Sequence, residues 1–263
     1  MSKPTRILSW NVNGIRAALR KGFSSFIDDL EPDIVMLQEV RALPEQIPEP
    51  WAEPPGWNVH WHPAEKKGYS GTATWSRTPL DVKGTGLGAG DPEGRLLHTK
   101  SGGLHTVNLY LPSGSSSPER QQKKDEWMDR FLPWTERIVS SSEPYILAGD
   151  FNIAHTPDDI HNPSGNKKSS GFLPHERDWF TQLLDLGWVD VVRRDAGPGK
   201  GPYSWWSNRG RARELNRGWR IDYFLCNPAA ADRVVACKTH RAGGLTVSDH
   251  APITIDLDLD PSK

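Results

Sequence analysis

Short apolar runs that end on a polar side chain recur along the whole chain. Each run, with the residues that follow it, is Arg6–Trp10 with Asn11, Ile34–Leu37 with Gln38 and Glu39, Leu104–Leu109 with Tyr110, or Tyr145–Ala148 with Gly149–Asn152. Runs this short and apolar are typical of buried strands. Further strands are predicted at Ile221–Leu225 and at Ile253–Leu259, where alternating polarity indicates one solvent-exposed face. The sequence therefore predicts a sheet core with polar groups at the ends of its strands.

Helical periodicity occupies the segments between these strands. Apolar residues spaced three and four apart predict a helix over residues 23–30, which Pro32 ends. Ser117–Pro118 has the cap and first position of a second helix, and Pro133 is expected to bend or break that helix. The buried stripe expected on this second helix consists of Trp127, Phe131 and Ile138. A third helix is expected to contain Trp179, Phe180, Leu183 and Leu184 and to be closed by Gly187.

We expect an α+β fold. Strands and helices are interleaved and several strands alternate in polarity, which a purely parallel sheet with helices on both faces does not show. Two mixed sheets packed face to face, with helices outside, fit the pattern better. Pro44–Pro63 is rich in Pro and Trp and is expected to be a long ordered surface loop. We see no repeat and no low-complexity linker, so residues 1–263 are predicted to form a single domain.

Composition excludes several classes of protein. The 263 residues are 36% hydrophobic and 25% charged, as in soluble globular proteins, which excludes a largely disordered chain. No apolar run approaches the length of about 18 residues needed to cross a bilayer, and the first residues contain no signal-peptide core. Two cysteines exclude a disulfide scaffold and a cysteine-rich zinc module. We therefore expect a cytoplasmic protein with no membrane contact.

The charge is balanced over the chain but locally uneven. A formal net charge of −1 argues against a protein that binds polyanions by bulk charge. It does not exclude a nuclease, because a track for phosphates needs only local Lys and Arg. From Lys200 to Arg220 the chain has six basic residues and one acidic residue, Glu214. This segment is the candidate phosphate-binding region.

The polar residues at the strand ends have the chemistry of a metal site. They are Asn11, Glu39, Asp150 with Asn152, and Asp249 with His250. Carboxylate and amide oxygens with one imidazole, and no cysteine, suit a hard cation such as Mg²⁺ or Mn²⁺. Each residue taken singly has an ordinary explanation, since an Asn after a strand is most often a turn residue. Their joint occurrence at successive strand ends is what predicts a site.

Longer motifs around these residues resemble a known family. Trp10–Gly14, Leu37–Glu39, Gly149–Asn152 and Ser248–His250 are similar to motifs of the endonuclease/exonuclease/phosphatase superfamily. Lys67–Gly71, Tyr110–Pro112, Gly171–Arg177 and Trp219–Tyr223 are similar to those of the exonuclease III group of abasic-site DNA repair nucleases. The resemblance extends from Arg6 to about Leu257. It implies a four-layer α/β/β/α sandwich with the site at one edge of the paired sheets.

A metal centre is implied by the resemblance. Glu39 is the leading ligand for Mg²⁺, for which Mn²⁺ is expected to substitute, because this ion is commonly held by one or two carboxylates and substrate phosphate. Asn11 and Asp249 are expected beside it, as direct or water-mediated ligands. The full set of metal-site candidates is Asn11, Glu39, Asp150, Asn152, Asp249 and His250.

Catalytic roles also follow from the chemistry and the resemblance. Asp150 is expected to orient and deprotonate the attacking water, with a pKa raised by neighbouring carboxylates. Asp222 is expected to hold His250 by one ring nitrogen and to leave the other for the phosphate. Asn152 contacts the phosphate or the water, and Tyr110 contacts the phosphate near the leaving group.

Substrate recognition is implied for a separate set of residues. Trp205, Trp219 and Ile221 match family positions that wall an apolar pocket for a sugar that has lost its base. The implied partner is double-stranded DNA with abasic sites or blocked 3′ ends, bound by a monomer and cut 5′ to the abasic site to leave a 3′-hydroxyl. Removal of 3′ blocks and 3′→5′ exonuclease action are also implied. The residues expected to contact DNA phosphates are Arg209, Arg211, Arg213 and Arg217, extended by Lys66, Lys67, Lys167 and Lys168.

The chain departs from the family pattern at several positions. Ser113 stands where many relatives have Asn or Gln, and Asn13 replaces an Asp found in some relatives. Residues 161–165 differ in a loop expected near DNA, which bears on the balance of endonuclease and exonuclease action.

Alternative interpretations remain open at the level of sequence. The tryptophans can simply pack between layers, Asp222 can pair with Arg220, and Tyr110 can be an ordinary strand-end residue. At the level of function, the alternatives are a phosphoesterase of the same superfamily acting on lipid headgroups or inositol phosphates, and a catalytically silent DNA-binding relative.

Overall fold

The computed structural model describes residues 3–88 and 90–259. The ends of the predicted domain, residues 1–2 and 260–263, lie outside the described residues. The strands are β1 (Thr5–Asn11), β2 (Ile34–Gln38), β3 (Asn58–His62), β4 (Thr72–Ser76), β5 (Asp81–Thr85), β6 (Leu96–Ser101), β7 (Leu104–Tyr110), β8 (Tyr145–Asp150), β9 (Val189–Asp190), β10 (Asp222–Cys226), β11 (Val234–Thr239) and β12 (Ile253–Leu257). The helices are α1 (Ile15–Arg20), α2 (Phe23–Leu30), α3 (Pro118–Val139), α4 (Pro174–Asp185), α5 (Val191–Ala196), α6 (Pro228–Ala231) and α7 (Arg241–Thr246).

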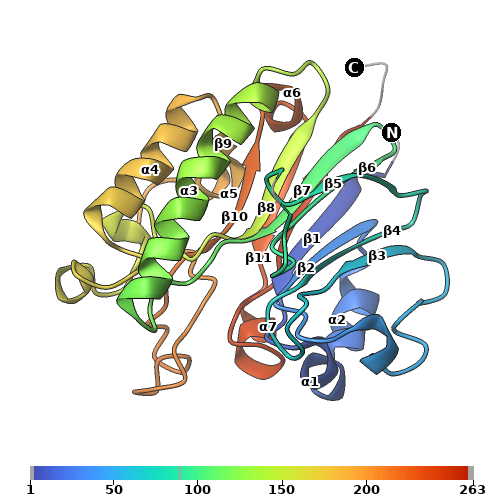
Figure 1. The fold of residues 1–263 in the computed structure, drawn as a ribbon, viewed down its shortest axis with the longest axis horizontal. Coiled ribbons are helices and arrows are strands. Elements are labelled where there is room, and N and C mark those ends of the chain that lie inside the picture. The colour runs from blue at the N-terminus through green and yellow to red at the C-terminus, as the bar shows by residue number, and fades with distance from the viewer. Residues whose placement is uncertain (1–2, 89, 260–263) are drawn as a thin grey trace.

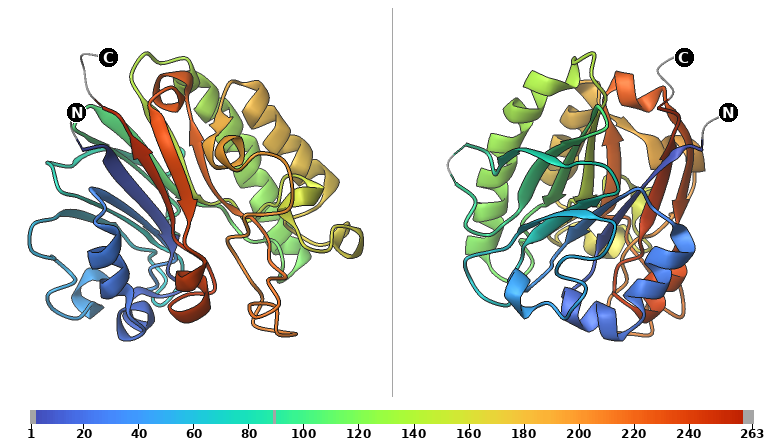
Figure 2. Two further views of the ribbon diagram at one scale, coloured as in Figure 1. Left: turned by 180° about the vertical axis from the view of Figure 1, so that it is seen from behind. Right: turned by 90° about the vertical axis from the view of Figure 1, so that its right-hand side faces the viewer.

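Two mixed sheets face each other between helical layers, which confirms the predicted α+β sandwich (Figures 1 and 2). Within the described residues, one six-stranded sheet has the order β11-β12-β1-β2-β4-β3 and the other has the order β5-β6-β7-β8-β10-β9. Helices α3 and α4 lie on the outer side of the second sheet, and α1 and α2 lie beside the first (Figure 2). None of the helices in the described part of the chain is long and apolar enough to span a membrane.

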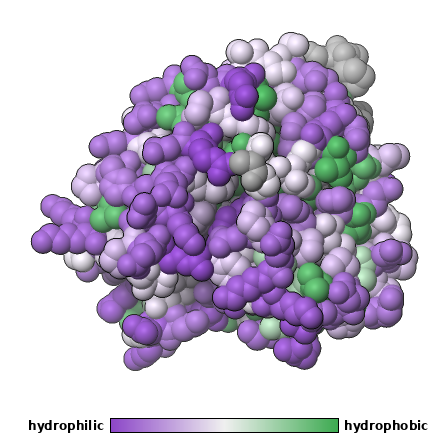
Figure 3. All heavy atoms as spheres, viewed as in Figure 1, coloured by the Kyte–Doolittle hydropathy of each residue, from purple (hydrophilic) through white to green (hydrophobic). Residues whose placement is uncertain are grey.

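Apolar residues of three layers form the core. Between the sheets, Ile7 and Ile255 pack with Ile146 and Phe224. Outside the second sheet, apolar residues of α3 and α4 cover β7, β8 and β10. The face of the molecule that carries α3 and α4 is largely hydrophilic, as expected for helices that bury one side only (Figure 3).

Helix α3 differs from its prediction in two respects. Ser117 caps it as expected, accepting a hydrogen bond from the backbone N–H of Arg120, but the helix continues unbroken through Pro133. Packing of residues on both sides of the proline against the second sheet offsets the lost hydrogen bond. The buried face is also shifted: Phe131 is buried, whereas Trp127 and Ile138 are only half-buried. The fully covered positions of this face are Lys124, Met128, Phe131, Thr135 and Val139.

Two other predictions were wrong. The segment Pro44–Pro63 is not only loop, because it contains β3, which pairs with β4 at the edge of the first sheet. The expected exposed face of β12 is covered. Thr254 is bonded to His240, and Asp256 accepts a hydrogen bond from Arg6 at 2.7 Å. Both partners come from the strands or loops that flank β12, so its neighbours supply the cover that alternation alone could not reveal.

Candidate active site

The topology brings the polar strand ends together at one end of the sandwich. Strands β1 and β2 are parallel and end at Asn11 and Gln38, directly before Glu39. Strands β7 and β8 are also parallel, and their last residues, Tyr110 and Asp150, are paired. Antiparallel β10 begins at Asp222, opposite Asp150. Because parallel strands end on the same side and antiparallel strands begin there, side chains far apart in sequence meet.

A cleft of about 770 Å³ opens at this end of the sandwich. It is lined by residues that the sequence singled out for catalysis, metal binding and substrate recognition. These are Glu39, Tyr110, Asp150, Asn152, Asp249 and His250, with Trp205, Trp219 and Ile221. Of the remaining candidates, Asn11 and Asp222 contact these residues by hydrogen bonds. The structure therefore brings the predicted catalytic and metal-site candidates into one place; their individual roles stay predictions.

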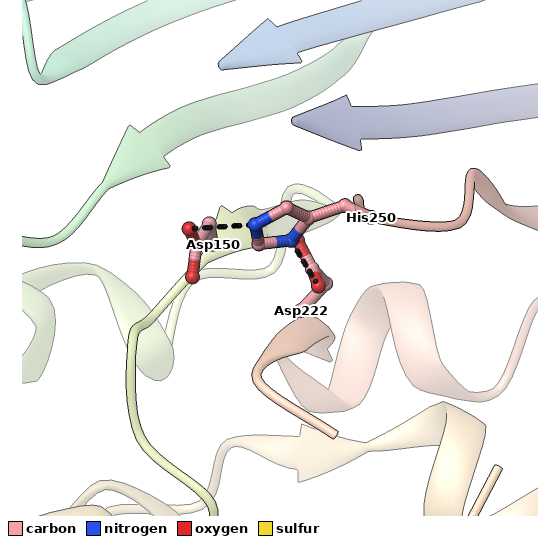
Figure 4. Close-up of side chains that lie close together, drawn as sticks. All are labelled: Asp150, Asp222 and His250. Atoms are coloured by element: carbon pink, nitrogen blue, oxygen red, sulfur yellow. Dashed lines mark hydrogen bonds and ion pairs between the residues drawn. The ribbon is translucent and has the colours of Figure 1, made fainter. Parts of the chain in front are cut away.

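His250 lies between two carboxylates (Figure 4). Its Nδ1 is 2.9 Å from Oδ2 of Asp222, and its Nε2 is 3.8 Å from Oδ2 of Asp150. Burial alone lowers the pKa of His250, but the two carboxylates outweigh burial and raise this pKa to about 10. The imidazole is therefore a protonated cation at neutral pH. Asp222 holds it in place, and Arg220 is not the partner of Asp222.

Asp150 sits in a strongly hydrogen-bonded turn. Oδ1 accepts from the backbone N–H of Asn152 at 2.8 Å, and Oδ2 accepts from Nδ2 of Asn11 at 2.9 Å. Burial raises the pKa of Asp150 to about 7, although His250 opposes the shift. Asn152 has a positive φ of 51°, and its side chain donates to the carbonyl of Leu111. A carboxyl group with a pKa near neutrality can accept a proton in the working range of an enzyme.

The oxygen-rich side of the cleft surrounds Glu39 and Asp249. Glu39 accepts from Nδ2 of Asn11 at 2.9 Å and is paired with Arg41. Asp249 accepts from Nδ2 of Asn13 at 2.7 Å and from the indole N–H of Trp205 at 3.1 Å. Sequence reasoning noted Asn13 only as a lost carboxylate and missed Arg41. The motif position beside Glu39 was the only available signal for Arg41.

The donor chemistry of this side fits a hard divalent cation. Carboxylates of Glu39 and Asp249, with amide oxygens nearby, are the ligands that Mg²⁺ prefers. Ligand atoms of Asp150, Asp222 and His250 also lie within 4.8 Å of one another. Both nitrogens of this imidazole face carboxylates, however, so we interpret that cluster as an ion triad around a protonated histidine. The fit to a metal therefore rests on Glu39 and Asp249.

An apolar wall adjoins the histidine. The rings of Trp205 and Trp219 meet edge to face with centroids 6.0 Å apart, and the ring of Trp205 lies 6.5 Å from that of His250. Ile221 and Phe172 pack behind them. The hydroxyl of Ser204 accepts from the backbone N–H groups of residues 221 and 222, which joins this wall to the start of β10. An apolar surface thus lies within reach of the charged groups.

Tyr110 lines the cleft beside a buried arginine. The guanidinium of Arg95 lies 4.8 Å from the centre of the Tyr110 ring and donates to the carbonyl of Tyr110 at 2.9 Å. Burial raises the pKa of Tyr110 well above its usual value, so the phenol remains protonated and can donate a hydrogen bond.

The basic residues predicted to contact phosphates are spread over a wider surface. Among the residues that the structure describes, Lys168 lines the cleft, whereas Lys66, Lys67, Lys167, Arg209, Arg211 and Arg213 do not. Arg217 borders a neighbouring hollow of about 380 Å³ with Trp219, and Arg211 is exposed and paired with Glu214. A further hollow of about 360 Å³, bordered by Arg16, Arg20 and Arg41, was missed by the sequence analysis. Two of these arginines are on α1, where a helix pattern alone indicates a solvated face.

A second buried ion cluster lies behind the apolar wall. Nε of Arg220 donates to Asp159 at 2.6 Å, and its Nη1 donates to Asp190 at 2.7 Å. Arg193 also pairs with Asp159. Burial alone raises the pKa of Asp159, but Arg220 outweighs burial and lowers this pKa to about 2.

Comparison with known proteins decides the family. The chain matches the model of the endonuclease/exonuclease/phosphatase family over residues 8–250. The chain belongs to this family. It is 35% identical over 257 residues to the exodeoxyribonuclease of Bacillus subtilis, covering 97% of this chain and 100% of the relative.

Solved structures of similar proteins agree with this assignment. An AP endonuclease from Archaeoglobus fulgidus has a TM-score of 0.88 at 30% identity, covering 97% of this chain and 100% of that chain. A 3′ phosphatase from Neisseria, bound to a product DNA hairpin, has a TM-score of 0.88 at 30% identity, covering 97% of this chain and 99% of that chain. Within its family, the chain is a DNA repair nuclease of the exonuclease III and AP endonuclease group.

Proposed function

We propose that this nuclease hydrolyses the phosphodiester 5′ to an abasic site in double-stranded DNA and leaves a 3′-hydroxyl. We propose that it also removes 3′ phosphates and other 3′ blocks and has some 3′→5′ exonuclease action. The names of the solved relatives, an AP endonuclease and a 3′ phosphatase bound to a DNA hairpin, support this choice of substrates. The phosphoesterase of lipid headgroups stays the rival within the same family.

The apolar wall supports recognition of a sugar without its base. Trp205, Trp219 and Ile221 line the cleft next to His250, so a deoxyribose turned out of the helix can pack against them while its phosphate meets the charged side. A nucleotide that keeps its base is larger by a whole ring system, and such pockets reject it by size.

The charged triad supports hydrolysis of a phosphate ester. Asp150 takes the proton of a water whose oxygen attacks the phosphorus, and the bond from phosphorus to the 3′ oxygen breaks. The departing oxygen takes up a proton and becomes the 3′-hydroxyl. Protonated His250, held by Asp222, donates through Nε2 to a non-bridging oxygen and stabilises the added negative charge. Asn152 positions the water or phosphate, and Tyr110 contacts the phosphate beside the departing oxygen.

We propose Mg²⁺ as the resident cation, with Mn²⁺ able to substitute. Glu39 and Asp249 would hold it, with Asn11, Asp150, Asn152 and His250 as further candidates. When bound, such an ion neutralises charge on the phosphate and on the leaving oxygen. The donor set of hard oxygen atoms, without cysteine, supports this assignment.

We also propose that the protein acts as a monomer in the cytoplasm. Cys226 and Cys237 are both free, as is usual in a reducing compartment. Size-exclusion chromatography with light scattering tests the monomer, and a dimer at micromolar concentration would refute it.

The single observation that carries the proposal is the buried Asp150–His250–Asp222 triad beside an apolar wall. The test is a side-by-side assay on end-labelled duplexes with an internal abasic analogue, a 3′-phosphate or a matched 3′ end, and on phospholipid vesicles. Incision at the abasic analogue that EDTA abolishes and Mg²⁺ or Mn²⁺ restores is the expected result. Cleavage undiminished in EDTA would remove the metal, and hydrolysis of phospholipid alone would favour the rival.

A further inference from the structure

Lys124 is a wholly buried lysine behind the active site. Its side chain and that of Glu176 are both 0% exposed. Nζ of Lys124 donates to the carboxylate of Glu176 at 2.5 Å and to the backbone carbonyl of Asn152 at 3.0 Å. A helical lysine normally lies in solvent, so this contact joins α3 directly to the catalytic turn at the end of β8.

Glu176 extends the contact to a third segment. Its Oε2 accepts from the backbone N–H of Gly171 at 2.6 Å and from that of Leu173 at 3.0 Å. Its Oε1 also accepts from Nε2 of Gln121 at 3.1 Å. The buried carboxylate is therefore fully hydrogen-bonded, and it fixes the segment that leads into α4.

The segments tied together border the cleft. The backbone N–H of Asn152 donates to Asp150, and the carbonyl of Gly171 accepts from the backbone N–H of Ala154 at 2.8 Å. A Cβ added to Gly171 would lie 2.9 Å from the carbonyl oxygen of Asn152 and 3.2 Å from the ring of Trp219. Movement of this carbonyl is thus coupled to both Asp150 and the apolar wall. Lys124 itself does not line the cleft, among the residues described there.

Stability alone does not account for this ion pair. Replacing a buried pair by uncharged residues of similar volume is often neutral or stabilising, because burial removes the water around both charges. The adjoining buried positions of α3, Met128 and Phe131, are apolar and pack well against the second sheet. A lysine at this position is therefore best explained by a requirement for its three hydrogen-bond donors.

We infer that Lys124 and Glu176 are a positioning pair that holds the turn Asp150–Asn152 in its catalytic geometry. The inference rests on the proposed function of this turn. Lys124 acts through the carbonyl of Asn152, and Glu176 acts by holding Lys124 and the segment Gly171–Leu173.

The first test is the double variant Lys124→Met/Glu176→Gln, which leaves no unpaired buried charge. We expect a folded protein whose kcat on the abasic duplex falls about 10- to 100-fold with little change in KM, because a small misplacement of a catalytic group has this effect. Lys123→Met is the matched control, since Lys123 is the exposed neighbour on the same helix, and it should leave kcat unchanged. A folded double variant with kcat within about twofold of wild type, far below that misplacement effect, would overturn the inference.

A second test moves the cation. Gln121 already contacts Glu176, so Gln121→Lys combined with Lys124→Met neutralises Glu176 from the neighbouring turn of α3. We expect this variant to fold while kcat stays low, because the new ammonium does not replace the contact with the carbonyl of Asn152. Full recovery of kcat would show that charge balance is sufficient and would refute the positioning role.

A readout independent of activity separates this inference from the proposed substrate. Amide hydrogen exchange should become faster at residues 152–154 and 171–173 in the double variant and stay unchanged in Lys123→Met. Unchanged exchange at these residues would count against the inference. Failure of the wild-type enzyme on the abasic duplex would instead refute the substrate assignment, and the kcat comparison would then be made on the 3′ end that the wild type does cleave.

Discussion

Two buried groups of three charged residues lie on either side of the start of β10. In one, His250 lies between Asp150 and Asp222, and in the other, Arg220 lies between Asp159 and Asp190. Both place one cation between two carboxylates, and the central residue of the second is only two positions from Asp222. They differ in the chemistry of the cation.

The difference shows in the acids. Next to Arg220, which never loses its proton, the pKa of Asp159 is lowered to about 2. Next to His250, which can titrate, burial prevails and the pKa of Asp150 is raised to about 7. A permanent cation thus keeps its partner ionised and makes a structural link, whereas a titratable cation leaves a carboxyl group able to exchange protons near neutral pH. We expect the two triads to respond to mutation in opposite ways.

The largest effect is expected from Asp150→Asn and His250→Asn. Each should lower kcat/KM by about 10²- to 10⁴-fold, because a positioned proton acceptor or donor contributes this much to a reaction. Duplex binding and the unfolding midpoint should change little. Turnover near that of the wild type in either variant would contradict the assigned roles, and kinetics with binding by fluorescence anisotropy provide the measurement.

Arg220→Met should act mainly on stability. Removing the arginine leaves Asp159 and Asp190 buried without their partner, so the free energy of unfolding should fall by about 3–5 kcal/mol. Because the pKa of Asp159 is lowered from 3.8 to about 2 on folding, the stabilisation by this ion pair is complete above pH 3.8 and is lost as pH falls through about 2. Urea unfolding of wild type and variant between pH 2 and 7 tests this. A variant of unchanged stability whose kcat falls as far as that of Asp150→Asn would erase the distinction between the triads.

Asp222→Asn should shift the pH profile without abolishing cleavage. The wild type needs Asp150 ionised and His250 protonated, so kcat/KM should rise through about pH 7 and fall through about pH 10. Removing the charge of Asp222 makes the imidazolium less stable and lowers the pKa of His250. The alkaline limb should therefore move to lower pH. An alkaline limb at the same pH in the variant would show that His250 is not the group that titrates there.

The smallest effect is expected from Arg211→Ala. Arg211 also pairs with a carboxylate, Glu214, but its side chain is 71% exposed. Water and salt screen such a pair, so the unfolding midpoint should not change measurably. If Arg211 contacts a DNA phosphate as predicted, the slope of log binding constant against log salt should become shallower by about 0.9. An unchanged slope would remove Arg211 from the phosphate track, whereas a large loss of stability would show that exposure does not separate this pair from the buried triads.

Much of the site was predictable because it lies where apolar runs end. Asn11, Glu39, Tyr110 and Asp150 follow runs whose burial is written in the sequence, and parallel pairing carries such ends to the same side. The resemblance to the exonuclease III group was confirmed by the family match over residues 8–250. Local hydrophobic pattern and motif order were sufficient for these residues.

Other parts depended on contacts between distant segments. Lys124 has the local signature of a solvated helix position, and only Glu176, 52 residues away, explains its burial. Arg220 was weighed as a partner of Asp222, yet it bonds to Asp159 and Asp190 from two other segments. Likewise, the cover on β12 comes from its flanking segments.

The amino-acid sequence by itself determined the layers, the strand ends and which chemical groups appear at them, because hydrophobic periodicity and turn residues act over a few neighbouring positions. Only the tertiary structure decided which charges are buried, which partner each of them has and how far its pKa moves. Those properties depend on desolvation and on Coulomb interactions, which act through space between residues that the sequence keeps far apart.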